Sequence, residues 1–407
     1  MSSPKPPATP SPNDTSPPSP SQTVSAWSGL RWSSGVVRRS DATGDAVIFD
    51  ILPWGDGYVG VGSVNHAVGG DDAAFFTSTD GLRWSITTQM AQSAAQEDSG
   101  PRFLAHLGNG ILAVSDNDGF APPNLWRTAD GSHWSIVNSA SWRDAWTNGN
   151  LLAVAGGPSG LVAIGSEGLS LMEPGPPIIV SSSDGLTWTR LVLPSSFDHA
   201  VFGDLLAYGG GFVIAGRDGE PDATPQHGGA PGVGKPAAWI SADGLTWTAA
   251  DVDGKAVAGG ELSAISAGPD GLFAEGRTDA SRILSGWSST DGARWRLIGK
   301  VGTNLPDLAL VAGDGTHLVM FGRTSCKTTA LTAWISGNGT TWTPLVFSGS
   351  SAIPAAVAGP ICDANGVEGW TTGGMTISAA VVLPDGVLVV GSGGLPQEFW
   401  MATAIRP

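Results

Sequence analysis

One short pattern occurs six times in this chain of 407 residues, and it limits the possible folds more than any other feature. Each copy, which we call a box, has Ser or Thr, any residue, Asp or Asn, then Gly, with Trp three residues after the Gly. Successive box Trp residues lie 47 to 59 residues apart. The central residues of the boxes are Asp80, Asp130, Asp184, Asp243, Asp291 and Asn338. A repeat of this length is typical of solenoid or ring-shaped folds.

The residue types of the box predict a tight turn between two β-strands. The Asp side chain can accept hydrogen bonds from backbone N–H groups a residue or two further on, and the Gly can take the positive φ that the turn requires. The Trp then starts the next strand and brings a large apolar ring into the core. A bulky residue lies eight positions before each Trp, on the preceding strand: Phe76, Trp126, Val180, Trp239, Trp287 and Trp334.

Two more strands are expected before each box, because short apolar runs divided by Gly-rich turns, as in 206–216 and 311–322, indicate a strand pair. Four strands in about 40–50 residues are typical of a β-propeller blade. We therefore predict an all-β fold, a seven-bladed β-propeller of four-stranded antiparallel blades spanning residues 24–407. Residues 381–401 supply three strands, with Trp400 at the position of Trp239, and the N-terminal strand with Trp32 completes the last blade.

Residues 1–23 are rich in Pro, Ser and Thr and poor in apolar side chains, which predicts a disordered tether. The start of the chain resembles the mature end of a bacterial lipoprotein. We therefore expect an extracellular or cell-surface monomer without a transmembrane segment, with a cytoplasmic protein carrying a loose tail as the alternative. The formal net charge of −16 argues against a nucleic-acid partner, because phosphate contacts need clustered cations.

The boxes resemble the Asp-box, or bacterial-neuraminidase repeat, of sialidases and their non-enzymatic relatives. The family pattern is Ser-x-Asp-x-Gly-x-Thr-Trp, whereas in this chain the Gly directly follows the Asp, which places it nearer the non-sialidase branch. The resemblance implies that each box is structural and lies between the third and fourth strands of a blade. It also implies that ligands bind on the opposite side of the ring, where the second strand leads into the third.

Three arginines follow the Gly that ends a second strand on three consecutive blades: Arg217, Arg277 and Arg323. Guanidinium groups bind carboxylates with two parallel hydrogen bonds, and sialidases use three arginines on the substrate carboxylate. These residues are therefore candidate ligands for an acidic group. The alternative is that an Arg at this position is a tolerated feature of the repeat, paired with neighbouring acids.

The remaining candidates for chemistry are few. A sialidase uses a Tyr nucleophile, but Tyr58 and Tyr208 are expected at turns on the box side, so no catalytic residue is assigned. Cys326 and Cys362 are a candidate disulfide, with two free thiols as the alternative. The six His and two Cys residues show no zinc spacing, so we expect neither a metal nor a cofactor.

The leading functional hypothesis is an exported or surface-tethered module that binds a glycan or a protein through the loops opposite the boxes. The alternative is a sialidase-like exo-glycosidase that binds an acidic sugar with Arg217, Arg277 and Arg323. A third hypothesis is an assembly factor, because a propeller family that helps build photosynthetic complexes carries similar boxes.

Overall fold

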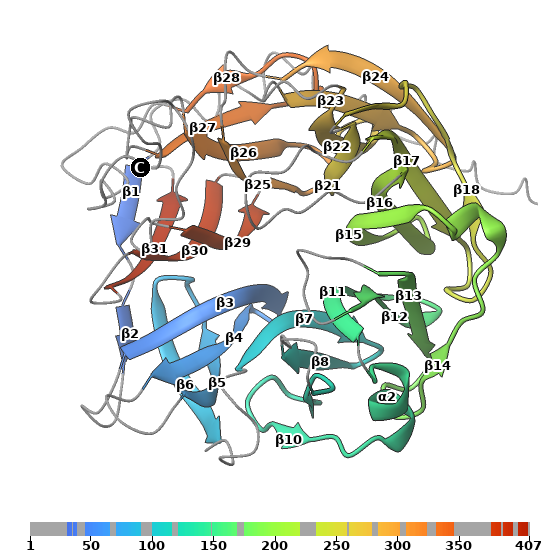
Figure 1. Cartoon of the computed structure of the whole chain (residues 1–407). Helices are drawn as coiled ribbons and strands as arrows, with labels where there is room; N and C mark the ends of the chain where they lie inside the picture. Colours follow the sequence, from blue (N-terminus) through green and yellow to red (C-terminus); the bar gives the residue numbers. More distant parts are fainter. Residues whose placement is uncertain are drawn as a thin grey trace, which may run out of the picture.

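The computed structural model describes residues 31–34, 36–38, 45–65, 71–90, 100–115, 121–147, 149–168, 175–219, 233–258, 260–278, 284–301, 307–323, 331–345, 376–383, 386–393 and 398–405. The fold is an all-β propeller whose four-stranded antiparallel blades stand around a central axis (Figure 1). The predicted fold class is therefore confirmed at this level. The predicted tether, residues 1–23, and the two cysteines lie outside the described residues.

The strands form sheets, which we number in chain order. The strands of each sheet are given in the order in which they pair, starting from the one nearest the axis, which we call the first strand. Sheet 1 contains β3 (Asp45–Trp54), β4 (Gly57–Asn65), β5 (Asp71–Ser78) and β6 (Arg83–Met90). Sheet 2 contains β7 (Pro101–Leu107), β8 (Gly110–Ser115), β9 (Leu125–Thr128) and β10 (Ser135–Ile136). Sheet 3 contains β11 (Gly149–Gly157), β12 (Gly160–Glu167), β13 (Pro177–Ser182) and β14 (Thr189–Arg190). Sheet 4 contains β15 (Ala200–Tyr208), β16 (Gly211–Gly219), β17 (Val233–Ser241) and β18 (Thr248–Ala249).

The remaining sheets follow the same order. Sheet 5 contains β21 (Glu261–Gly268), β22 (Gly271–Arg277), β23 (Leu284–Ser289) and β24 (Arg294–Lys300). Sheet 6 contains β25 (Asp307–Gly313), β26 (Leu318–Arg323), β27 (Leu331–Ser336) and β28 (Thr343–Pro344). Sheet 7 contains β29 (Thr376–Leu383), β30 (Gly386–Gly393), β31 (Glu398–Ile405) and β1 (Arg31–Ser34). First strands of neighbouring sheets contact one another from β3 through β7, β11, β15, β21, β25 and β29 back to β3.

Each of these first strands contains a β-bulge near its beginning, and a small residue of the second strand lies opposite it. In sheets 1, 3, 4 and 5 this residue is Gly62, Gly165, Gly216 or Gly276. A Cβ there would lie only 1.8–2.2 Å from a backbone oxygen of the first strand. The Gly that precedes Arg217 and the Gly that precedes Arg277 are thus required by the bulge.

The box turns have one common hydrogen-bond pattern. Oδ1 of the central Asp or Asn accepts from the N–H groups two and three residues further on, at 2.7–3.1 Å, so the turn extends one residue beyond the prediction. The box glycines have φ between 68° and 77°. In five boxes the Trp Nε1–H donates to the carbonyl of the box Gly, at 2.8–3.3 Å; the exception is Trp247.

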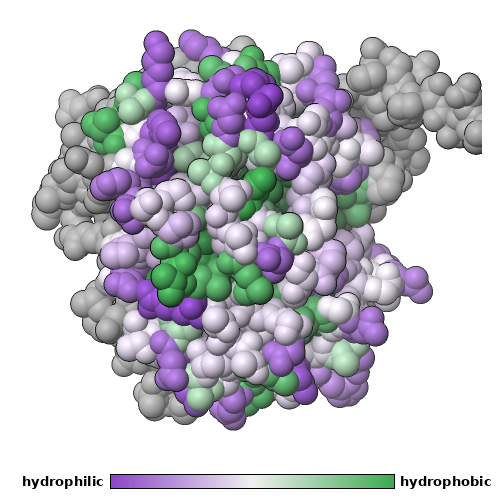
Figure 2. Space-filling model, turned by 90° about the vertical axis from the view of Figure 1, so that its right-hand side faces the viewer, coloured by the Kyte–Doolittle hydropathy of each residue, from purple (hydrophilic) through white to green (hydrophobic). Residues whose placement is uncertain are grey.

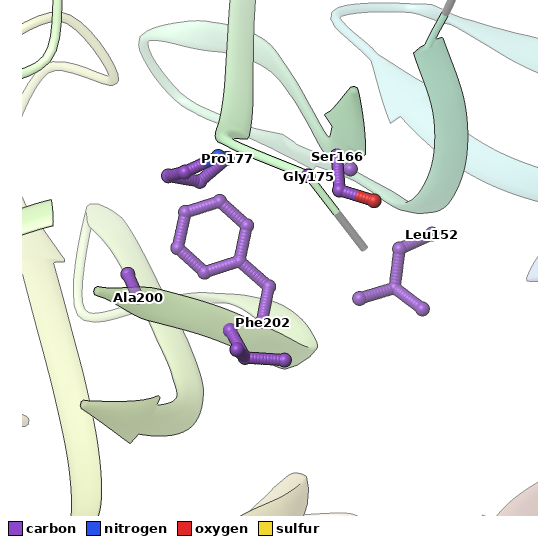
Figure 3. A pocket seen from close by; sticks show the side chains of 8 residues that line it. Leu152, Ser166, Gly175, Pro177, Ala200 and Phe202 are labelled. Carbon is purple, nitrogen blue, oxygen red and sulfur yellow. The ribbon is translucent and has the colours of Figure 1, made fainter. Parts of the chain in front are cut away.

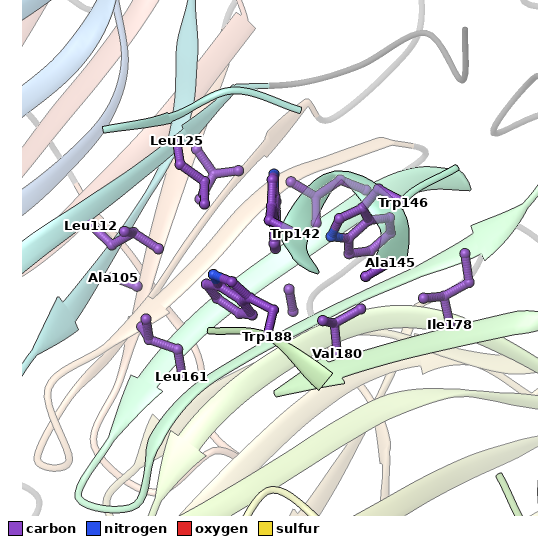
Figure 4. Close-up of a cluster of buried hydrophobic side chains, with 13 residues drawn as sticks. Ala105, Leu112, Leu125, Trp142, Ala145, Trp146, Leu161, Ile178, Val180 and Trp188 are labelled. Atoms are coloured by element: carbon purple, nitrogen blue, oxygen red, sulfur yellow. The ribbon is translucent and has the colours of Figure 1, made fainter. Parts of the chain in front are cut away.

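The hydrophobic core is divided among the junctions between successive sheets. Each described junction contains one box Trp and the bulky residue that was predicted eight positions before it. At the junction of sheets 2 and 3, Trp188 packs against Trp142 with ring centroids 4.6 Å apart (Figure 4). The box Gly also faces the preceding sheet, since a Cβ on Gly244 would lie 2.8 Å from Cγ2 of Val162.

Several elements were not predicted from the sequence. A short helix, α2 (Ala140–Ala145), buries Trp142 against sheet 3, and a 3-10 turn, η1 (Ser195–Phe197), precedes β15. Strands β2 (Val36–Arg38) and β19 (Asp251–Val252) add to sheets 1 and 5 in parallel, and β20 (Val257–Ala258) pairs with β17.

The expected position of Trp400 was wrong. In sheet 7 the register equivalent of Trp239 is Ala402, two residues further along β31. Trp400 lies opposite Gly391, as Ala237 lies opposite Gly216. The prediction aligned Trp400 with Trp239 because both are tryptophans. The pairing of the third strand with the second is instead fixed by the bulge and by the Gly opposite it.

Candidate functional site

The side of the ring opposite the boxes, which we call the loop face, carries the ends of the second strands and the starts of the first and third strands. The three predicted arginines are equivalent in register on this face. Arg217 pairs with Val201, Arg277 with Glu261 and Arg323 with Asp307, each directly before the bulge of its sheet. The repeat alignment that selected them is thus correct for the backbone.

The arginines nevertheless differ in their surroundings. The side chain of Arg217 is only 4% exposed, whereas Arg277 is exposed, and the side chain of Arg323 lies outside the described residues. Because side chains alternate along a strand, Arg217 faces sheet 5 with Ala215, and Arg277 faces sheet 6 with Phe273. These two side chains therefore belong to different junctions. A joint carboxylate clamp stays a prediction.

A partly open cavity of about 100 Å³ lies on the loop face at the junction of sheets 3 and 4, and we call it the Ser166 cavity. In Figure 3 the rings of Pro177 and Phe202 lie side by side, with the side chains of Leu152 and Ser166 nearby. Leu152 is the extra residue of the β11 bulge, which re-aims its side chain. The lining residues are Leu152, Gly165, Ser166, Gly175, Pro177, Ala200, Val201 and Phe202.

The repeat explains why this junction is hollow. Ser166 pairs with Asn150 directly before the bulge of sheet 3, the register position that Arg217 occupies in sheet 4. A short side chain thus stands where the next sheet places a long buried one. At the junction of sheets 1 and 2 the equivalent Ser63 is covered instead by Gly100, where a Cβ would lie 3.0 Å from the Cβ of Ser63.

Two half-buried carboxylates join neighbouring sheets through hydrogen bonds between first strands. Oδ2 of Asp50 accepts from the N–H of Leu104 at 2.8 Å, and Oδ1 accepts from Ile51. Asp204, its equivalent in sheet 4, accepts from Ile265 and Leu205 in the same way. Burial raises the pKa of Asp50 to about 7 and that of Asp204 to about 6, although the two backbone N–H groups oppose the shift in each case.

A third acid, Glu275, is fully buried and occupies an apolar position of the repeat. Its register equivalents in sheets 1, 2 and 3 are Val61, Val114 and Ile164. Burial raises the pKa of Glu275 to about 8; the Arg277 charge opposes the shift, and nearby acids add to it. Oε2 of Glu275 has no hydrogen-bond partner among the described residues.

The sequence reasoning missed these acids and Ser166, although the signals were present. Asp50 and Glu275 interrupt apolar strands, in the runs 46–52 and 272–276. Ser166 follows the strand-ending Gly165 as Arg217 follows Gly216, so the rule that selected the arginines would also have selected Ser166. The tyrosines were placed correctly: Tyr58 and Tyr208 lie at the turns between first and second strands, on the box side.

Other parts of the described surface carry fewer groups suited to binding a ligand or a metal ion. A second cavity, of about 540 Å³, lies on the box side; its described lining includes Arg127, Thr128 and His133 and contains no carboxylate. One edge of the ring shows a compact apolar area within a mostly hydrophilic surface (Figure 2). No group of three or more His, Cys, Asp or Glu side chains in the described part of the chain is arranged to hold a metal ion. No helix among the described residues is long and apolar enough to cross a bilayer.

Comparison with known proteins supports the fold only. No protein-family model matches the chain, and no curated protein is similar to it in sequence. The structure of YCF48 bound to a D1 peptide is similar, with a TM-score of 0.52 and 14% identity over 93% of this chain and 97% of that one. The β-propeller domain of the Trilobed protease from Pyrococcus furiosus, described as having an open velcro topology, has a TM-score of 0.50 and 9% identity over 89% and 94%. Pyrococcus horikoshii acylaminoacyl peptidase has a TM-score of 0.50 and 8% identity, over 90% of this chain and 53% of that one.

Proposed function

We propose that this protein is a non-catalytic binding module that takes a segment of another protein on its loop face. The Ser166 cavity is the observation that carries the proposal. It is lined mainly by apolar groups, and among the described residues of its lining only Ser166 has a polar side chain. Such a cavity suits an apolar side chain of a protein partner.

The same cavity gives little support to a glycan ligand. A sugar ring presents several hydroxyl groups, each of which needs a polar partner when it is buried. A glycoside hydrolase further needs two carboxylates that face the sugar, and none of the described residues that line the Ser166 cavity is a carboxylate. The sialidase-like alternative therefore rests on the three arginines alone. The peptide in the YCF48 structure belongs to that protein, and at 14% identity the likeness supports a shared fold and nothing more.

The proposal includes a ring of seven blades closed by the N-terminal strand. In support, the described strands form seven hydrogen-bonded sheets, and Trp32 of β1 lies opposite Ala404 of β31. Ala404 is the register equivalent of Ser289, which begins the box of sheet 5. The repeated turn geometry likewise supports a relationship to the non-sialidase branch of the Asp-box proteins. A place outside the cell or on its surface, with residues 1–23 as the tether and a Cys326–Cys362 disulfide, completes the proposal.

The function is tested by comparing ligand classes on the purified full-length chain. A random peptide-display library and a glycan array are screened in parallel, and hits are measured by calorimetry. Selection of peptides with micromolar or better affinity supports the proposal. Binding to glycans without peptide binding contradicts it, and turnover of fluorogenic sialosides or uronides would replace it with the hydrolase alternative.

A further inference from the structure

We propose that the Ser166 cavity is a specificity pocket for one small apolar residue, such as Val or Pro, of an extended peptide that pairs with the inner edge of β15. This inference rests on the proposed function and narrows it to one junction, one backbone conformation and one size of side chain. It depends on the topology of β15, the size of the cavity and the difference between Ser166 and Arg217.

The beginning of the inner edge of β15, at Ala200–Phe202, is available for strand pairing, whereas Gly203 further along packs against the backbone of β21. In the described part of sheet 4, β15 stands at the end of the strand order and forms its ladder with β16 alone. Alternate N–H and C=O groups of an end strand point away from its partner, so a peptide in extended conformation can bond to them. The first three residues of β15, Ala200 to Phe202, also line the Ser166 cavity. A peptide on this edge would thus place a side chain beside the cavity.

The size and chemistry of the cavity limit which side chain can enter. An apolar cavity of about 150 Å³ holds a benzene ring. The Ser166 cavity, at about 100 Å³, suits an isopropyl group or a pyrrolidine ring and is too small for an aromatic side chain or a pyranose ring. Leu152, Pro177 and Phe202 are half-buried, so their apolar surface remains in reach of an incoming side chain.

The next junction shows how the repeat can fill this position. Arg217 is the register equivalent of Ser166, and it is buried between sheets 4 and 5. A long side chain is therefore compatible with the backbone at this point of the repeat. Ser166 leaves part of this space unfilled at the junction of sheets 3 and 4, where the cavity lies. Replacing Ser166 with a longer residue should close the pocket and keep the fold.

The experiment uses the full-length chain and capped nonapeptides with Ser and Thr flanks, whose central residue is Gly, Ala, Val, Pro, Phe, Trp, Asp or Lys. We expect the Val and Pro peptides to bind about tenfold more tightly than the Gly peptide, from burial of a few methyl or methylene groups. The Phe and Trp peptides should bind no better than the Gly peptide. N-methylation of the residues flanking the central position should abolish binding, because it removes the strand-pairing N–H groups.

Two pocket-filling variants and one control complete the test. Ser166→Leu and Ser166→Arg should remove the preference for Val over Gly, while Ser135→Leu, an exposed change on β10, should leave it intact. Thermal unfolding shows whether a variant is folded, and Ser166→Leu should retain or raise the Tm. Equal binding of the Gly, Val and Trp peptides, or a preference that survives in Ser166→Leu, overturns the pocket but leaves the proposed function standing. Absence of binding by every peptide, including those from the display library, overturns both.

Discussion

Oδ2 of Asp204 accepts a hydrogen bond from the backbone N–H of Ile265 at 3.0 Å, across the junction of sheets 4 and 5. Asp50 makes the equivalent bond to Leu104 between sheets 1 and 2. The N–H groups on the inner edge of a first strand have no partner strand, so a carboxylate at the bulge satisfies one such group on each of two sheets. These acids stabilise the ring where backbone pairing between sheets is absent.

Asp204→Asn should remove part of the pH dependence of stability. The folded-state pKa of Asp204 is raised to about 6 by burial, so its favourable contribution is complete below its unfolded pKa and is lost as the pH rises through about 6. The wild-type free energy of unfolding, relative to the variant, should therefore fall by about 2 kcal/mol between pH 4 and pH 7.5. Urea unfolding at four pH values measures this, and a constant difference across the range would contradict it.

Glu275→Val should stabilise the protein, most strongly at high pH. The raised pKa of Glu275, about 8, means that its contribution to stability is lost as the pH rises toward and through 8. Val matches the register equivalents Val61 and Val114 and removes an oxygen without a described partner. We expect a gain of about 1–3 kcal/mol at pH 8.5 and a smaller gain at pH 5.

The reverse substitution at the same register position is the matched control. Val114→Glu places an acid in the fully buried core between sheets 2 and 3 and should destabilise the protein by about 3 kcal/mol or more at pH 8.5. Urea unfolding of both variants under identical conditions gives the comparison. A loss of stability in Glu275→Val at pH 8.5 would show that the acid is held by a favourable interaction.

The fold was predictable because its strongest constraints are local. The Asp and Gly of each box determine a turn within a few residues, and the turn directs the box Trp into the core. The Arg217–Arg277 equivalence followed from the same repeat. Their different burial did not, because it depends on residues of the next sheet, which lie some 45 or more positions away in the chain.

The Ser166 cavity was hidden for a related reason. A cavity arises where side chains of two sheets fail to meet, and no motif marks the absence of a contact. The short Ser166 and the bulged Leu152 become informative only when the packing of sheet 3 against sheet 4 places them beside Ala200–Phe202. The helix α2 was not predicted because it has only six residues, too few to show a helical spacing of apolar side chains that would distinguish it from a loop.

Gly244→Ala should destabilise the protein more than Gly209→Ala. Both glycines have positive φ, at 73° and 60°, so both variants carry the same kind of backbone strain, about 1 kcal/mol. A Cβ on Gly244 would also lie 2.8 Å from Val162, whereas one on Gly209 meets nothing within 4 Å. We expect an additional loss of about 1–3 kcal/mol for Gly244→Ala in thermal or urea unfolding. Equal losses would show that the box Gly is required for its backbone conformation alone.

Arg217→Ala and Arg277→Ala should separate the two arginines that the sequence treats alike. Arg217 is buried, so its removal leaves a void between sheets 4 and 5 and should cost about 2 kcal/mol or more in unfolding free energy. Arg277 is exposed, so its removal should change stability by less than about 0.5 kcal/mol at pH 5, where Glu275 is neutral.

The Arg277 charge opposes the rise in the pKa of Glu275, so Arg277→Ala should raise that pKa further. The loss of stability linked to Glu275 would then continue to higher pH and be larger in total, which urea unfolding between pH 6 and pH 9 would detect. An unchanged pH profile would place the guanidinium too far from Glu275 to act on it, and would leave Arg277 free to serve a ligand.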